Sequence, residues 1–113
     1  MLVDPKFELF FKPKFLRWLE TNEHIYREFE RQALALIARG RAHYSARTIV
    51  EVMVHESILR EDMGPYKIGN DHAPDLARVF AITHPEHRMF WEYRRPDWPS
   101  FLSTIETGLA NAA

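Results

Sequence analysis

The most constraining feature of this sequence is an amphipathic repeat over residues 23–39 that leads directly into Gly40. Apolar side chains recur there every three or four residues, which is the spacing of one face of an α-helix. These side chains are Ile25, Tyr26, Phe29, Ala33, Leu36 and Ile37. Asn22 stands at a favourable N-cap position, and Gly40 can adopt the left-handed conformation that ends many helices. The sequence therefore predicts a long helix with one buried face.

Similar spacing predicts several further helices. They cover residues 13–22, 46–62, 74–83, 86–95 and 101–113. The stretch Thr48–Val54 is ambiguous, because its β-branched residues also suit a strand. We favour a helix there, because Ser45 can cap it and the apolar pattern continues to Leu59. Thr83 and Glu86 have the spacing of a capping box, which predicts that a helix starts at this corner.

These elements predict a mainly α fold. A length of 113 residues suits one domain. We expect a compact helical domain over 1–95, and a C-terminal amphipathic helix within 96–113 that packs on this domain or on a partner. At most a short β-hairpin is expected near 63–70. The short, glycine-containing link between the second and third helices favours a helix-turn-helix or winged-helix-like arrangement.

Composition excludes several classes of protein. The chain has no cysteine, which removes disulfide scaffolds and thiolate metal sites. It has neither the order of a signal peptide nor an apolar run of the ~20 residues that span a membrane, so we expect a cytoplasmic protein without a membrane partner. A net charge of −1 argues against polyanion binding by the whole surface but permits a local basic face.

A basic cluster around Gly40 is the first candidate site. Arginines near a turn and near a helix N-terminus can contact phosphate or base edges. The candidate residues for double-stranded DNA are Arg39, Arg41, His43, Arg47 and Thr48, with Lys67 and Asn70 as wing contacts from the Gly69–His72 hinge. Glu51 opposes this interpretation because a carboxylate repels DNA. Short turns are also common in all-α proteins, so a plain connector remains the alternative.

Signals for catalysis or metal binding are weak. The sequence has no nucleophile elbow, no phosphate-binding glycine loop and no dinucleotide fingerprint. Ser57 is interpreted as a helix-surface residue. Glu51 and His55 have chelating spacing, but a His-Glu-x-x-His motif is missing. We therefore predict no catalytic residue, no metal ligand and no cofactor.

The aromatic C-terminal end is the second candidate site. Aromatic residues beside arginine are typical of interfaces, although such rings also close small cores. The candidate partner-binding residues are Trp91, Arg94, Trp98, Phe101, Ile105 and Leu109. Self-association through Phe101, Ile105 and Leu109 is compatible with either function.

Residues Phe15 to Arg94 resemble a group of small proteins of unassigned function from bacteriophages and bacterial genomes. The motifs that carry the resemblance are "HYSARTI", a "YKI" stretch before "ARVF", and a "HPE" corner. Gly69 stands where that group has an asparagine. The resemblance implies a mobile-element context, in which small helical proteins often bind DNA or disable a host protein.

Two functions therefore stand as hypotheses. The first is a small DNA-binding regulatory protein that acts through the basic cluster. The second is an interaction module or inhibitor that binds a host protein through its aromatic C-terminal surface.

Overall fold

Helices make up nearly all of the regular structure in a computed structural model of the chain, which describes residues 2–60, 66–69, 71–92 and 98–112. The elements in chain order are the 3₁₀-helix η1 (Pro5–Phe10), α1 (Pro13–Thr21), α2 (Glu23–Ala38), α3 (Ala46–Leu59), α4 (His72–Thr83), the 3₁₀-helix η2 (Pro85–His87) and α5 (Trp98–Ala112). The predicted mainly α fold class is confirmed. No described helix is long and apolar enough to cross a membrane.

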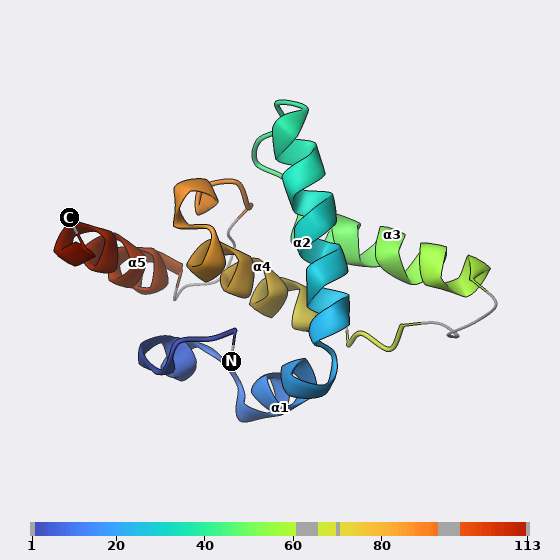
Figure 1. Cartoon of the computed structure of the whole chain (residues 1–113), viewed down its shortest axis with the longest axis horizontal. Helices are drawn as coiled ribbons and strands as arrows, with labels where there is room; N and C mark the ends of the chain where they lie inside the picture. The colour runs from blue at the N-terminus through green and yellow to red at the C-terminus, as the bar shows by residue number, and fades with distance from the viewer. Residues whose placement is uncertain (1, 61–65, 70, 93–97, 113) are drawn as a thin grey trace.

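Helix α4 forms the centre of the molecule. Most of its side chains are buried, including Leu76, Val79 and Phe80. Helices α2 and α3 both pack on α4 and on each other, and α1 packs on α2. Figure 1 shows α2 standing across the middle, with α3 leaving on one side, α4 and α5 on the other, and η1 and α1 below. The projecting end of α2 is the end that carries Gly40.

The end of α2 follows the prediction. Gly40 has a φ of 81°, its N–H donates to the carbonyl of Ile37, and the N–H of Arg41 donates to the carbonyl of Leu36. This pair of bonds is the Schellman arrangement, which satisfies carbonyls that a helix end leaves free. It also fixes the backbone of Arg41 against the last turn of α2.

The ambiguous stretch 48–54 is helical, as favoured from sequence. The Ser45 hydroxyl accepts from the N–H of Thr48 at 3.4 Å, and Ile49, Val50 and Met53 are buried on one face. Ser57 corrects our expectation of a surface residue. It is 1% exposed, its hydroxyl donates to the carbonyl of Val54, and it accepts from the N–H of Tyr66.

The segment after α3 has no strand in its described part, residues 66–69. The rest of the expected hairpin, residues 63–65 and 70, lies outside the described residues.

The helix predicted over 86–95 is wrong in its described part. Only the 3₁₀-helix η2 forms, and the chain then runs alongside Tyr44. The N–H of Tyr44 donates to the carbonyl of Phe90, and the N–H of Glu92 donates to the carbonyl of Tyr44. This path buries the adjacent rings of Phe90 and Trp91. The predicted capping box is not formed either, because Thr83 is the last residue of α4 and its hydroxyl donates to the carbonyls of Val79 and Phe80.

A buried arginine joins both ends of the chain to α4. Arg78 is 1% exposed and donates from Nη1 to the carbonyl of Phe10 at the end of η1. Its guanidinium lies over the rings of Trp98 and Phe101 in α5, 4.7 and 5.7 Å from their centroids. The Phe101 ring also meets Phe10 edge-on at 5.3 Å. The C-terminal helix therefore packs on its own domain.

Replacing Arg78 tests this link. We expect Arg78→Ala to lower the free energy of unfolding by about 3 kcal/mol or more, because it leaves the buried Phe10 carbonyl without this donor and removes two cation–π contacts. Urea denaturation followed by circular dichroism measures the change. Arg17→Ala is the control, since Arg17 is exposed on α1. Equal small losses in both variants would contradict the role given to Arg78.

Candidate functional site: a groove between helices α2 and α3

A groove of about 440 Å³ lies between α2 and α3. One face of each helix and the connecting Tyr44 line it. The lining residues are Arg31, Gln32, Ala35, Leu36, Arg39, Tyr44, Ile49, Val52 and Glu56. The residues from the α2 side are one or three positions apart and those of α3 are three or four apart, so each set lies on a single helical face.

The middle of the groove is apolar. Ile49 is buried at 2% exposure, Leu36 is half-buried and Val52 keeps 42% of its surface exposed. The Tyr44 ring stacks parallel to Phe90, with 6.2 Å between centroids. Val52 is thus one of the few large apolar side chains that the described fold leaves exposed, and it lies in a concave surface.

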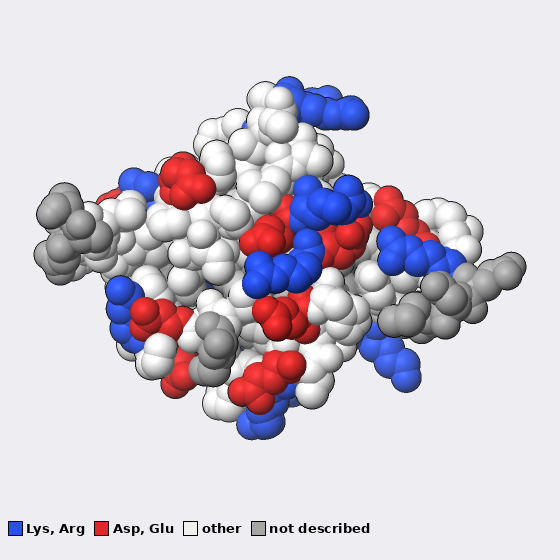
Figure 2. Space-filling view, in the orientation of Figure 1, with Lys and Arg blue, Asp and Glu red and all other residues white. Residues whose placement is uncertain are grey.

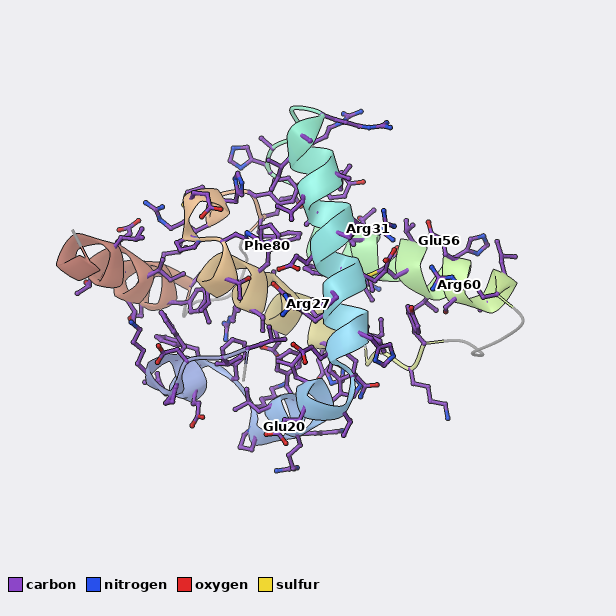
Figure 3. The ribbon with its side chains drawn as sticks, in the orientation of Figure 1. Glu20, Arg27, Arg31, Glu56, Arg60 and Phe80 are labelled. Carbon is purple, nitrogen blue, oxygen red and sulfur yellow. The ribbon has the colours of Figure 1, made fainter. Side chains whose placement is uncertain are left out.

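One end of the groove is polar and internally satisfied. The amide of Gln32 donates to Glu28 on its own helix at 3.2 Å and to Glu56 across the groove at 3.3 Å. Arg31 forms two hydrogen bonds with Glu28, at 2.5 and 3.0 Å, and these lower the pKa of that carboxyl. Figure 3 shows Arg31 and Glu56 together where the two helices cross. At this end Arg31 is paired with Glu28, and Glu56 accepts a hydrogen bond from the neutral amide of Gln32.

The other end is cationic. Arg39 is the exposed C-cap of α2 and lines the groove. Within the described ranges neither Arg39 nor the exposed Arg41 forms an ion pair with a carboxylate. Figure 2 shows mixed acidic and basic side chains over the crossing of α2 and α3, and only basic ones at the projecting end of α2.

The structure keeps part of the predicted basic cluster together. Arg39, Arg41 and His43 are all exposed at the turn, where His43 has a φ of 54°. Thr48 is exposed on the first turn of α3. Arg47, however, pairs with Glu51 at 3.2 Å, so its charge is partly neutralised.

Lys67 does not join this cluster, which corrects its expected place beside the arginines. Its carbonyl accepts from the indole of Trp18 at 3.2 Å, and the carbonyl of Trp18 accepts from Asn22, which precedes α2. Lys67 therefore lies at the start of α2, whereas Arg39 lies at its end. Sixteen residues of α-helix separate these ends by roughly 24 Å. Asn70 lies outside the described residues.

The predicted aromatic partner surface is also corrected. Trp91, Trp98, Phe101 and Ile105 are each 4% exposed or less. Trp91 stacks on Phe29 with 5.2 Å between centroids, so the rings fill the chain's own core. Leu109 remains 42% exposed, and Arg94 lies outside the described residues.

Sequence reasoning missed most of the groove. Arg31, Gln32 and Glu56 resembled ordinary surface residues, and Leu36 was assigned to the core. Their helical spacing placed each on a definite face. The rotation of α2 against α3 brings the two faces together, and the sequence of either helix alone does not predict it.

A second polar cluster joins α2 to the end of α4. The Tyr26 and Thr83 hydroxyls lie 2.7 Å apart, and Glu30 lies 2.8 Å from His84 and 3.2 Å from Arg27. Burial raises the pKa of the Tyr26 hydroxyl above its usual range. These groups satisfy one another, which is the arrangement of a structural clamp between helices. Among the described residues no group of three His, Cys, Asp or Glu side chains could hold a metal ion.

The hinge before α4 is held by a buried histidine. His72 is 8% exposed, its ring lies 4.6 Å from that of Trp18, and its Nδ1 accepts from the N–H of Gly69 at 3.2 Å. Burial, and then the charges of Lys14 and Lys12, lower the pKa of His72, against the opposing effect of Asp71. The folded chain therefore favours the neutral form of this ring. The hinge is a packed connector that lies far from Arg39 and Arg41, the arginines on either side of Gly40.

This histidine predicts a pH dependence of stability. The unfolded chain binds a proton at His72 more readily than the folded chain, so folding stability is lost as the pH falls below about 6.5. We expect the free energy of unfolding, measured by urea denaturation between about pH 7 and pH 5, to fall less steeply in His72→Asn than in the wild type. Asn keeps an acceptor near Nδ1 but does not titrate.

His55→Asn serves as the control for this measurement. His55 is exposed on α3, so this variant should keep the wild-type slope. Parallel pH profiles for the wild type and His72→Asn would contradict the assignment.

No protein-family model, curated protein or solved structure matches this chain. A function must therefore be inferred from the chain's own residues.

Proposed function

We propose that the chain is a protein-recognition module that binds a segment of a partner protein in the groove between α2 and α3. The observation that carries this proposal is the combination of an apolar floor, with Val52 exposed in it, and a cation at one end, Arg39, to which the described residues give no carboxylate partner. Apolar contact supplies affinity, while a directed charge at the rim supplies orientation and specificity.

The dimensions of the groove support a peptide-sized occupant. A volume of about 440 Å³ lies at the lower part of the range for small-ligand sites, which suits one or two side chains of a docked segment. Grooves between packed helices are a recurring mode of segment binding. The proposal takes up our second hypothesis, the interaction module, ahead of the DNA-binding protein that stood first, and it moves the interaction surface from the aromatic C-terminal end to this groove.

Filling the groove tests the proposal. We expect Ala35→Trp to reduce capture of a partner from a bacterial lysate by at least about tenfold, because the indole occupies the space over the apolar floor. Quantitative mass spectrometry of proteins retained by the immobilised chain measures the change. Ala35 is exposed, so the substitution leaves the core intact.

Ala38→Trp is the matched control. Ala38 is exposed on the same helix and does not line the groove. It should retain the same proteins as the wild type. Equal retention by both tryptophan variants, or no protein specific to the wild type, would contradict binding in the groove.

DNA binding is a second candidate, and one observation favours it. Arg39 and Arg41 are exposed at the end of α2, and in the described part of the chain neither forms an ion pair with a carboxylate. Two such cations can contact adjacent phosphates. The pairing of Arg47 with Glu51 and the distant position of Lys67 make this the weaker candidate.

Salt dependence tests the DNA candidate. If the end of α2 that carries Gly40 binds phosphate, replacing Arg39 and Arg41 by Ala should weaken binding to a labelled DNA duplex. It should also reduce the slope of log K against log salt by about 2, since each phosphate contact contributes close to one. Fluorescence anisotropy measures both. Lys14→Ala with Arg17→Ala removes the same charge from exposed positions on α1 and should have little effect. Equal losses of DNA affinity in both double variants would rule out the end of α2 that carries Gly40 as the DNA site.

A further inference from the structure

We infer that the groove between α2 and α3 selects a partner segment in which a carboxylate stands beside a large apolar side chain, with the carboxylate facing Arg39. This inference rests on the proposed function and specifies the chemistry of its partner. It follows from how charge is distributed along the groove.

The end near Arg31 has little to offer an anion. The Gln32 amide donates to Glu28 and Glu56, and Arg31 donates to Glu28. Glu56 places a negative charge on the wall of the groove at this end. A carboxylate of the partner would be repelled here and would displace bonds that are already made.

The end near Arg39 has the opposite character. Its guanidinium carries five N–H donors in a planar fork that matches the two oxygens of a carboxylate. Arg39 is exposed, and the described residues give it no carboxylate of its own. The backbone N–H of Arg41 donates to the Leu36 carbonyl, which holds Arg41 beside the last turn of α2. Arg41 adds a second positive charge nearby. The donors of the groove that can bind a carboxylate of the partner therefore lie at this end.

The spacing along α2 sets the separation of the two features in the partner. Leu36 precedes Arg39 by three residues, which is about 4.5 Å along the helix axis. An apolar side chain seated on Leu36 and Val52 thus lies within one residue or two of extended chain, or within one turn of helix, of a carboxylate at Arg39. The occupant is therefore a short segment in which an Asp or Glu lies close to Leu, Phe or a similar residue.

The same features disfavour a nucleic acid as the occupant of the groove itself. Of the two arginines that line it, Arg31 pairs with Glu28, and only Arg39 has no carboxylate partner among the described residues. Glu56 repels phosphate, and the apolar floor of the groove offers nothing to a polyanion. A carboxylate next to an apolar group satisfies both the floor and the rim.

Selection from a displayed library of random short peptides tests the inference. The wild type and Ala38→Trp should enrich peptides that combine Asp or Glu with a large apolar residue, and Ala35→Trp should enrich none. Arg39→Glu should shift the enriched sequences toward Lys or Arg beside the same apolar residues. Arg39 is on the surface, so this reversal leaves the fold intact.

A synthetic copy of one enriched peptide gives the quantitative result. Replacing its acidic residue by Gln should weaken binding to the wild type by roughly three- to tenfold in fluorescence polarisation, the range for a partly exposed charge-assisted pair. Replacing the same residue by Lys should restore binding to Arg39→Glu. Failure of this charge exchange would overturn the inference.

The outcomes separate the two proposals. Peptides that bind the wild type, are lost on Ala35→Trp and show no acidic preference would overturn the inference about the partner and leave groove binding in place. No enrichment by the wild type would overturn groove binding, and with it the inference.

Discussion

The fold depends on a charged side chain placed where apolar residues usually stand. Arg78 lies in the core on α4, between the carbonyl that ends η1 and two rings of α5. Burying a guanidinium costs desolvation free energy, and its hydrogen bonds and ring contacts must offset that cost. A planar guanidinium can do both at once, because its edge donates while its faces lie on aromatic rings. The first and last elements of the chain are thereby held on the central helix.

This constraint decides which residues are left for function. A chain of 113 residues has few apolar side chains beyond those that its core requires. Most of its aromatic side chains are buried in that core. Trp98, Phe101 and Ile105 seat α5 against η1 and α4, so a surface built from them does not exist in the folded chain. The exposed apolar groups lie elsewhere, and Val52 is the one that lies in the groove between α2 and α3.

The two faces of that groove have different origins. The face on the α2 side is polar at Arg31 and Gln32, apolar at Leu36 and cationic at Arg39. The face on α3 contributes a buried Ile49 and an exposed Val52. Where they meet, Glu28 and Glu56 pair with donors of α2 at one end only. In our proposal, selection of a partner depends on this asymmetry of charge more than on its amount.

Local sequence determined α2, its C-terminal end and the helical state of α3. The apolar spacing of 23–39, the glycine at position 40 and the serine cap at 45 each act within a few residues, so α2, its Schellman end and the helical state of α3 could be predicted. The path of residues 90–92 could not, because it depends on a bond to Tyr44, more than forty residues away. The pairing of Arg47 with Glu51 is also local, because the two residues stand four apart on α3. Only the tertiary structure decided that Lys67 lies near the start of α2 and that two helical faces form a groove. Side-chain spacing fixes a face on each helix, whereas the rotation of one helix against another is set by how all of the buried side chains pack together.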